Sequence, residues 1–248
     1  MGEERLGGLD AAALAARLAL PECVLRDRVR STMDLAHAAA ERGASAGTLI
    51  VADSQEAGRG RGGKRWESLP GHGLWMTLLE RPLSARGLDV LSLRLGLFLA
   101  EALDGFSDER VLLKWPNDLY VGLRKLAGIL VEARWRDQRV DWVAIGIGMN
   151  VEPPAGRSDA AGLVAGTSRL AVLERIVPVL RAAAAAEGPL SGTELSRYAA
   201  RDEASGRRIV LPAVGVVAGV SAAGELVVET DAGRVACRSG SLVFAEEG

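Results

Sequence analysis

Residues 58–66 read Gly-Arg-Gly-Arg-Gly-Gly-Lys-Arg-Trp, with four cations among four glycines, in a chain of 248 residues whose formal net charge is only −2. The overall charge of the chain therefore does not explain this cluster. Like charges at such density repel one another, and glycine allows the backbone to approach a ligand closely. We therefore expect a mobile loop that becomes ordered when it grips an anion with several oxygens.

Two generic phosphate-binding motifs fit the same letters. The glycines match the dinucleotide pattern G-x-G-x-x-G, and residues 58–64 match the beginning of a P-loop. Both motifs need a helix immediately afterwards, but Pro70 follows within six residues of Lys64, and Arg65 stands where a P-loop needs a hydroxyl. Neither motif is favoured. A solvated basic loop without a ligand stays open as an alternative for this stretch alone.

A second polar cluster, Lys114-Trp115-Pro116-Asn117-Asp118, lies between two apolar runs. The runs predict a strand, a short connection and a second strand that begins at Lys125, so the polar residues should gather near one hairpin. Asn and Asp are also ordinary turn residues. Lys125 is harder to explain by turn chemistry, because an ammonium at the start of an apolar strand needs an anionic partner.

A third pattern is the apolar run 145–151, which has glycines at alternate positions, Gly146 and Gly148. Glycines two apart leave one face of a strand bare, which allows a flat ligand or another backbone to approach closely. A bulge or crowded packing would explain the same pattern equally well.

Together, these motifs resemble those of the biotin protein ligases, which attach biotin to a lysine of a carrier protein. The resemblance covers about residues 30–150 and rests on four motifs in order: G-R-G-R-x-G-[RK]-x-W at 58–66, K-W-P-N-D at 114–118, K-x-x-G-I-L at 125–130 and G-x-G-x-N at 146–150. It implies an α/β (α+β) fold, in which a mixed β-sheet catalytic domain of the biotin/lipoate ligase type carries a small C-terminal SH3-like β-barrel. The expected parts are a short N-terminal segment at 1–30, the catalytic domain at 31–204 and the SH3-like domain at 205–248.

The resemblance also implies the site residues. Four are expected to be catalytic: Arg61, Lys114, Lys125 and Asp118. The biotin pocket is expected to comprise Ser31, Thr32, Gln55, Gly58, Arg59, Arg61, Trp66, Lys125, Gly128 and Gly146. ATP and the adenylate are expected to contact Arg59, Arg61, Lys64, Trp66, Lys114, Asn117 and Asn150, and magnesium is expected at Asp118 and Asn150. Ser31 and Thr32 also have the position of an N-cap for a helix that ends near Gly43.

The implied activity is that of an ATP-dependent biotin–[acetyl-CoA-carboxylase] ligase. Biotin would be activated to biotinyl-5′-AMP with release of pyrophosphate, and then transferred to a lysine of a biotin carboxyl carrier protein or domain. ATP and biotin would be substrates, with Mg²⁺ as the metal. A carboxylate that attacks the α-phosphate brings two anions together, so positioned cations are the main means of lowering the barrier.

Two alternatives remain open. A lipoate ligase or lipoyl/octanoyl transferase shares the implied fold, but the transferases need a cysteine, and Cys23 and Cys237 lie away from the motifs. A non-catalytic biotin-binding regulator would not need the complete set of cations and metal ligands. The family can place an adenine-stacking aromatic after the G-x-G-x-N strand, yet residues 152–166 contain no aromatic, so the adenine contacts stay unassigned.

Composition is consistent with this interpretation. With 48% hydrophobic residues, the chain can bury one substantial core and a small satellite domain. The N-terminus carries Glu3 and Glu4 instead of a signal peptide, and no apolar run has membrane length, so we expect a cytoplasmic protein without membrane contact. About 30 residues precede the motifs, too few for a helix-turn-helix, so no specific DNA binding is expected. Monomer and weak homodimer both stay open.

Hydrophobic periodicity predicts the remaining elements. Helices are expected at 10–20, 32–43, 88–102 and 169–186, the last interrupted at Pro178. Strands are expected at 48–52, 74–79, 111–115, 125–135 and 139–149. Short strands between 209 and 244 should form the small barrel.

Overall fold

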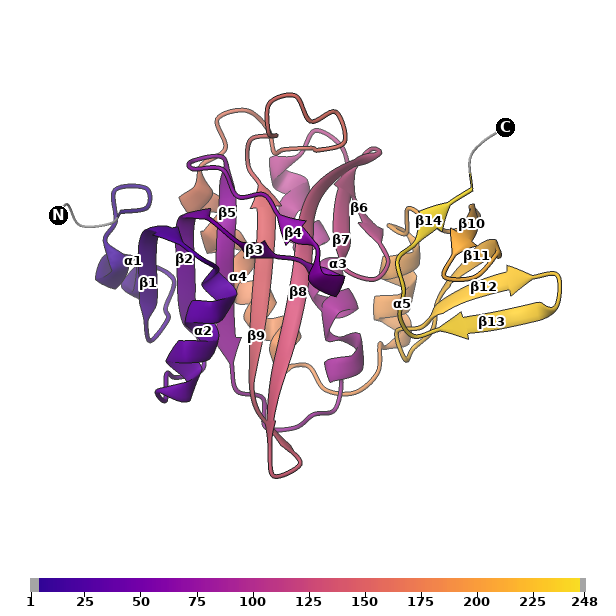
Figure 1. The fold of residues 1–248 in the computed structure, drawn as a ribbon, viewed down its shortest axis with the longest axis horizontal. Coiled ribbons are helices and arrows are strands. Elements are labelled where there is room, and N and C mark those ends of the chain that lie inside the picture. The colour runs from indigo at the N-terminus through magenta and orange to yellow at the C-terminus, as the bar shows by residue number, and fades with distance from the viewer. Residues whose placement is uncertain (1–4, 246–248) are drawn as a thin grey trace.

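The computed structural model describes residues 5–245, which form a seven-stranded mixed sheet, a five-stranded antiparallel sheet and a two-stranded hairpin (Figure 1). The large sheet has the order β1 (Cys23–Val29), β2 (Thr48–Gln55), β5 (Gly73–Glu80), β9 (Arg139–Asn150), β8 (Arg124–Arg136), β7 (Asp118–Val121) and β6 (Val111–Lys114). Only β1 and β2 pair in parallel. The predicted mixed sheet is confirmed.

The two faces of the large sheet are built differently. Along β9, Ile145, Ile147 and Met149 enter the main hydrophobic core, whereas Gly146 and Gly148 lie on the opposite face. The main core is covered by α3 (Leu91–Leu103) and α4 (Arg169–Ala185), while α1 (Ala11–Arg17) packs beside β1. The glycine-bearing face is therefore the one left for a binding site.

On that face, α2 (Thr32–Glu41) packs against β2, β5 and β9, in front of the sheet in Figure 1. Its predicted N-cap is confirmed, because the Ser31 hydroxyl accepts a hydrogen bond from the Met33 amide at 3.3 Å. The helix buries Met33 and Ala36 against Ile50 of β2 and Ala144 of β9. This packing holds the beginning of α2 against the middle of the sheet.

Three expectations about the elements were wrong. Helix α4 continues through Pro178 because its buried face, from Val172 to Ala183, holds both halves in the core. The connection between 115 and 124 contains a further strand, β7, which pairs with both β6 and β8. Strand β1 and helix α5 (Gly192–Ala199) were not predicted, although the sequence carries a signal for α5 in the capping box formed by Ser191 and Glu194.

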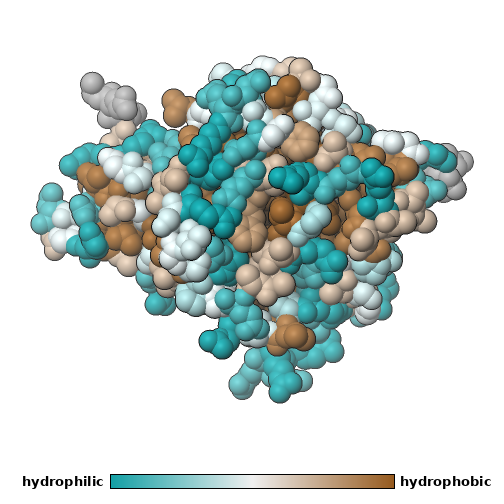
Figure 2. All heavy atoms as spheres, turned by 180° about the vertical axis from the view of Figure 1, so that it is seen from behind, coloured by the Kyte–Doolittle hydropathy of each residue, from teal (hydrophilic) through white to brown (hydrophobic). Residues whose placement is uncertain are grey.

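The C-terminal sheet is open, so the closed barrel was also wrong. Its order is β13 (Gly233–Cys237), β12 (Leu226–Thr230), β11 (Gly215–Val220), β10 (Arg208–Leu211) and β14 (Val243–Phe244). The described residues show no pairing between the end strands, β13 and β14, and the two residues of β14 offer few groups for such a ladder. A small antiparallel sheet of this kind is consistent with an SH3-like domain. Hydrophobic residues lie among hydrophilic ones on its surface, at the left of Figure 2.

The segment between the two sheets completes the edge of the large one. The Leu113 amide donates to the Arg201 carbonyl at 2.8 Å, and the Glu203 amide donates to the Leu113 carbonyl at 2.9 Å. Residues 201–203 thereby cover the exposed edge of β6. Every helix within residues 5–245 is too short or too polar to cross a membrane.

Candidate active site

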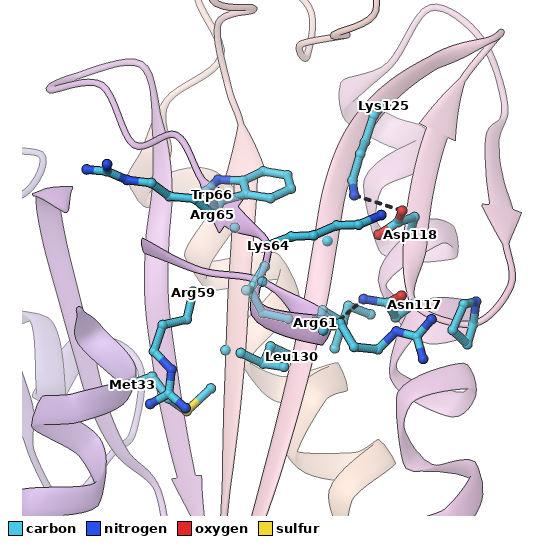
Figure 3. A pocket seen from close by; sticks show the side chains of 18 of the residues that line it. Met33, Arg59, Arg61, Lys64, Arg65, Trp66, Asn117, Asp118, Lys125 and Leu130 are labelled. Atoms are coloured by element: carbon cyan, nitrogen blue, oxygen red, sulfur yellow. Dashed lines mark hydrogen bonds and ion pairs between the residues drawn. The ribbon is translucent and has the colours of Figure 1, made fainter. Parts of the chain in front are cut away.

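A cavity of about 570 Å³ lies over the glycine-bearing face of the large sheet. Its wall comes from α2, from strands of the large sheet, from residues 59–66 and from residues 240–242 of the C-terminal part (Figure 3). The structure brings most of the predicted site residues to this wall: Ser31, Thr32, Gln55, Arg59, Arg61, Lys64, Trp66, Lys114, Asn117, Asp118, Lys125, Gly128 and Gly146. Gly58 and Asn150 do not line it.

Residues 58–66, called the basic loop below, form a tight hairpin across the cavity. Its short strands β3 (Gly58–Arg59) and β4 (Arg65–Trp66) pair, and the Gly60 amide donates to the Lys64 carbonyl at 2.7 Å. Gly62 and Gly63 at the tip have positive φ angles of 65° and 75°, which favour glycine. Figure 3 shows Lys64 pointing toward Asp118 and Lys125, while Arg65 points away.

The glycines on the sheet make room for Trp66. Gly128 of β8 and Gly148 of β9 lie opposite each other in the ladder, under the indole ring. A Cβ on Gly148 would lie 2.6 Å from the ring, and one on Gly128 would lie 3.0 Å from it. At Gly146, a Cβ would meet the Met33 methyl at 2.7 Å. Any larger residue at these positions would displace the cavity wall.

One end of the cavity is a buried, uncharged hydrogen-bonding cluster. The Thr77 hydroxyl donates to the Thr32 hydroxyl at 2.9 Å, and the Thr32 hydroxyl donates to Gln55 Oε1 at 3.2 Å. Gln55 Nε2 donates to the Ser68 hydroxyl at 2.9 Å. Because each group is held by a neighbour, the cluster presents donors and acceptors in fixed directions.

The other end is cationic. Lys125 Nζ lies 2.7 Å from Asp118 Oδ2 and 5.2 Å from the centre of the Trp66 ring. Lys114 Nζ lies 4.7 Å from the centre of the Phe244 ring, and no carboxylate within residues 5–245 forms an ion pair with it. Burial lowers the pKa of Lys114, although the nearby carboxylates of Glu203 and Asp118 oppose that shift. A partly dehydrated cation of this kind attracts an anionic ligand strongly.

The two arginines of the basic loop have different partners. Arg61 donates through Nη2 to the Gly240 carbonyl, which connects the loop to the C-terminal part of the chain. Arg59 donates to two carboxylates, Asp34 on α2 and Glu132 on β8. Arg61 therefore has a neutral partner, whereas Arg59 has two charged ones.

The donors expected to hold magnesium are separated. Asp118 presents its carboxylate at the cavity wall, whereas Asn150 is buried and donates through Nδ2 to the Ala161 carbonyl at 3.1 Å and the Lys125 carbonyl at 3.4 Å. Within residues 5–245, no group of three or more histidine, cysteine or acidic side chains is arranged as a metal site. Magnesium is often bound by one carboxylate together with substrate phosphates, so the arrangement at Asp118 fits a metal that arrives with ATP.

Several lining residues were not predicted. Gly148 belongs to the same alternating pattern as Gly146 and was detectable in the sequence. Thr77 lies within an apolar strand and carries no local signal. Residues 240–242 are about 180 positions from the basic loop, so only the tertiary fold brings them to the cavity.

The fold and the cavity define a class of protein, and sequence comparison identifies it. Residues 25–150, just over half of the chain, match the model of the biotin/lipoate A/B protein ligase family, and the chain belongs to that family. The matched region contains all the predicted site residues.

Individual relatives are ligases. The bifunctional ligase/repressor BirA of Bacillus spizizenii is 38% identical over 129 residues, which are 52% of this chain and 40% of that protein. The biotin–[acetyl-CoA-carboxylase] ligase of Paracoccus denitrificans is 36% identical over 51% of this chain and 52% of its own length. Both matches thus span less than two thirds of the relative. The structure of the Aquifex aeolicus biotin protein ligase in complex with biotin and ATP superposes with a TM-score of 0.72 at 25% identity, and covers 90% of this chain and 99% of that one.

Proposed function

We propose that this chain is an ATP-dependent biotin protein ligase. It forms biotinyl-5′-AMP from biotin and ATP, releases pyrophosphate, and transfers biotin to a lysine of a biotin carboxyl carrier protein or domain. The observation that carries the proposal is a single cavity with an uncharged hydrogen-bonding end and a cationic end. The biotin ligases among its relatives and structural neighbours support it.

The uncharged end suits the ureido ring of biotin. That ring is neutral but has both donors and acceptors, so a pocket for it needs a few fixed polar groups within apolar walls. Ser31, Thr32 and Gln55 supply the polar groups, and Trp66 with the bare faces of the glycines supplies the wall. The dithiolane ring of lipoate offers no comparable hydrogen bonds.

The cationic end suits the reaction with ATP. An oxygen of the biotin carboxylate attacks the α-phosphorus, the bond between that phosphorus and the α,β-bridging oxygen breaks, and pyrophosphate leaves with the bridging oxygen. Negative charge accumulates as the two anions meet. Arg61, Lys64, Lys114 and Lys125 line the cavity and would stabilise that charge. Magnesium held at Asp118 would neutralise charge on the leaving pyrophosphate.

In the second step, the amine of the carrier lysine attacks the acyl carbon, the acyl–phosphate bond breaks and AMP leaves. The amine must also lose a proton. Asp118 is the expected proton acceptor, through Oδ1, since the Lys125 ammonium occupies the other oxygen, Oδ2, at 2.7 Å. A cytoplasmic location, a monomer or weak homodimer, and the absence of specific DNA binding stay predictions from the sequence.

The proposal is tested with purified protein, ATP, Mg²⁺ and a biotin carboxyl carrier domain, and the carrier mass is measured after incubation with biotin, lipoate or an octanoyl donor. We expect modification with biotin alone, and only when ATP is present. Modification by lipoate but not biotin would support the lipoate alternative. Tight biotin binding without any ATP turnover would support a non-catalytic regulator.

A further inference from the structure

We propose that Arg59 fastens the basic loop to the sheet, and that His37 and Trp142 position the carboxylate that holds it. The sequence assigns Arg59 to the ligand together with Arg61. The geometry separates the two arginines: Arg61 faces the ligand, whereas Arg59 is an anchor. The catalytic consequence of the anchor rests on the proposed function, but the anchor itself can be tested without ligand.

A continuous chain of hydrogen bonds runs from the core to Arg59. The Trp142 indole Nε1 donates to His37 Nδ1 at 3.0 Å, and His37 Nε2 lies 2.8 Å from Glu132 Oε2. The other oxygen of Glu132, Oε1, accepts from Arg59 Nη2. Arg59 Nη1 donates to Asp34 Oδ1 at 2.9 Å. The chain thus connects β9, α2 and β8 to the first residues of the basic loop.

The series of hydrogen bonds from Trp142 to Glu132 admits one arrangement of protons. An indole N–H can only donate, so Nδ1 of His37 must accept, and a neutral imidazole then carries its proton on Nε2. That proton points at Glu132, whose carboxylate can only accept. Trp142 is 2% exposed, and the His37 and Glu132 side chains are 25% and 27% exposed, so packing holds these three side chains in place. Glu132 is therefore held in one orientation before Arg59 reaches it.

The partners of the two arginines explain the separation of roles. Hydrogen bonds between ionised groups are about twice as strong as neutral ones, and Arg59 makes two of them. The positive charge of Arg59 is also balanced by the carboxylates of Asp34 and Glu132, so little positive potential is left to attract an incoming anion. Arg61 instead donates to the neutral Gly240 carbonyl, a partner that a phosphate can replace. In Figure 3, Arg59 points toward Met33, away from the pair of Lys125 and Asp118.

The expected role of the anchor is to hold the basic loop over the cavity while Arg61 and Lys64 engage the ligand. Loss of the anchor would increase the fraction of time for which the loop is open. Ligand release would then become faster, with little change in the chemical step. His37, Glu132 and Trp142 are thus positioning residues that do not touch the ligand.

Limited trypsin digestion of the ligand-free protein tests the anchor directly. The basic loop contains four cleavage sites, and substitutions at His37 or Glu132 leave them all in place. We expect His37→Leu and Glu132→Gln each to raise the cleavage rate in the loop roughly threefold, the scale of a partly exposed ion pair. The double variant should be no faster than the faster single one, because both act through one contact. His37→Gln, which keeps an N–H donor, should restore most of the protection.

His72→Leu is the matched control. His72 is the other histidine of the chain, its Nδ1 lies 3.4 Å from Glu152 Oε2, and it does not line the cavity. It should leave cleavage of the loop unchanged. Unchanged cleavage in both His37→Leu and Glu132→Gln would overturn the anchor. If His37→Leu does not fold, the cleavage rate of Glu132→Gln alone tests the anchor.

Turnover then tests the catalytic consequence. His37→Leu should raise KM for biotin and the amount of released acyl-adenylate about threefold, while kcat for adenylation stays within about twofold. A loss of kcat with unchanged KM would overturn the positioning role. If the protein never biotinylates a carrier but these variants still speed cleavage of the basic loop, the anchor is supported and the proposed function is wrong.

Discussion

Lys125→Ala is the substitution that tests the adenylation site most directly. Lys125 is at the beginning of β8, where its ammonium pairs with Asp118 and lies over the ring of Trp66. The substitution removes one positive charge from the cavity wall and leaves the carboxylate of Asp118 without its partner. The local charge thus falls by one unit at the place where the transition state needs cations.

The magnitude follows from the charge and its surroundings. At about 5 Å and an effective dielectric constant of about 20, one unit charge contributes about 3 kcal/mol. This equals the usual effect of removing one group that stabilises developing charge, and it corresponds to a rate about a hundredfold lower. The cost in stability is much smaller. The side chains of Lys125 and Asp118 are 32% and 23% exposed, and a pair of this kind contributes at most about 1 kcal/mol.

The assay measures adenylation as biotin-dependent pyrophosphate release, beside thermal unfolding of the same samples. Arg124→Ala is the matched control, because Arg124 is the exposed neighbour of Lys125 on β8 and does not line the cavity. We expect Lys125→Ala to lose about a hundredfold in rate with a melting temperature lowered by no more than about 4 °C. An unaltered rate in a folded Lys125→Ala protein would refute the reasoning and leave Lys125 as a strand-edge charge.

Three other predictions concern the two cysteines, Asp202 in the segment between the two sheets, and Arg61 of the basic loop. The double variant Cys23→Ala, Cys237→Ala should retain carrier biotinylation, because burial raises the pKa of Cys23 to about 12 and neither cysteine lines the cavity. Loss of transfer in a folded variant would favour a thioester intermediate. Burial raises the pKa of Asp202 to about 6, so the folded state holds this proton more tightly than the unfolded chain, and that stabilisation disappears as the pH rises through 6. Asp202→Asn should therefore raise the melting temperature by up to roughly 10 °C at about pH 8, because a shift of about two pKa units corresponds to about 3 kcal/mol, and the difference should vanish near pH 4. An equal shift at both pH values would contradict it. Arg61→Gly should still form biotinyl-adenylate but release more of it into solution, as measured by chromatography of the filtrate, and an unchanged free fraction would show that Arg61 does not retain the intermediate.

Much of the catalytic part was readable from local patterns. The alternation of Gly146 and Gly148 within an apolar run predicted a bare strand face, and the structure places that face under Trp66 and Met33. Ser31 predicted the beginning of α2 because an N-cap is a contact between near neighbours in the chain. The motifs at 114–118 and 125–130 predicted that Lys125 and Asp118 gather near one hairpin, and the structure places Lys125 Nζ 2.7 Å from Asp118 Oδ2.

Other features had no local signal. Pro178 predicted an interruption, yet packing of the buried face of α4 keeps the helix continuous. The short C-terminal strands predicted a barrel, but closure depends on whether β13 and β14 meet, which no strand sequence specifies alone. Thr77 joins the uncharged cluster only because its register on β5 places it opposite Gly146.

The sequence by itself determined the family, the residue types at the cavity and the strand face on which they lie, because periodicity and motif spacing act over a few residues. Only the tertiary structure decided that the two arginines of the basic loop face different partners. Gly240 follows Arg61 by 179 positions, and Glu132 follows Arg59 by 73. Contacts between such distant positions depend on how the sheet, α2 and the C-terminal strands pack together, and that packing sets which charge is neutralised and which is left for a ligand.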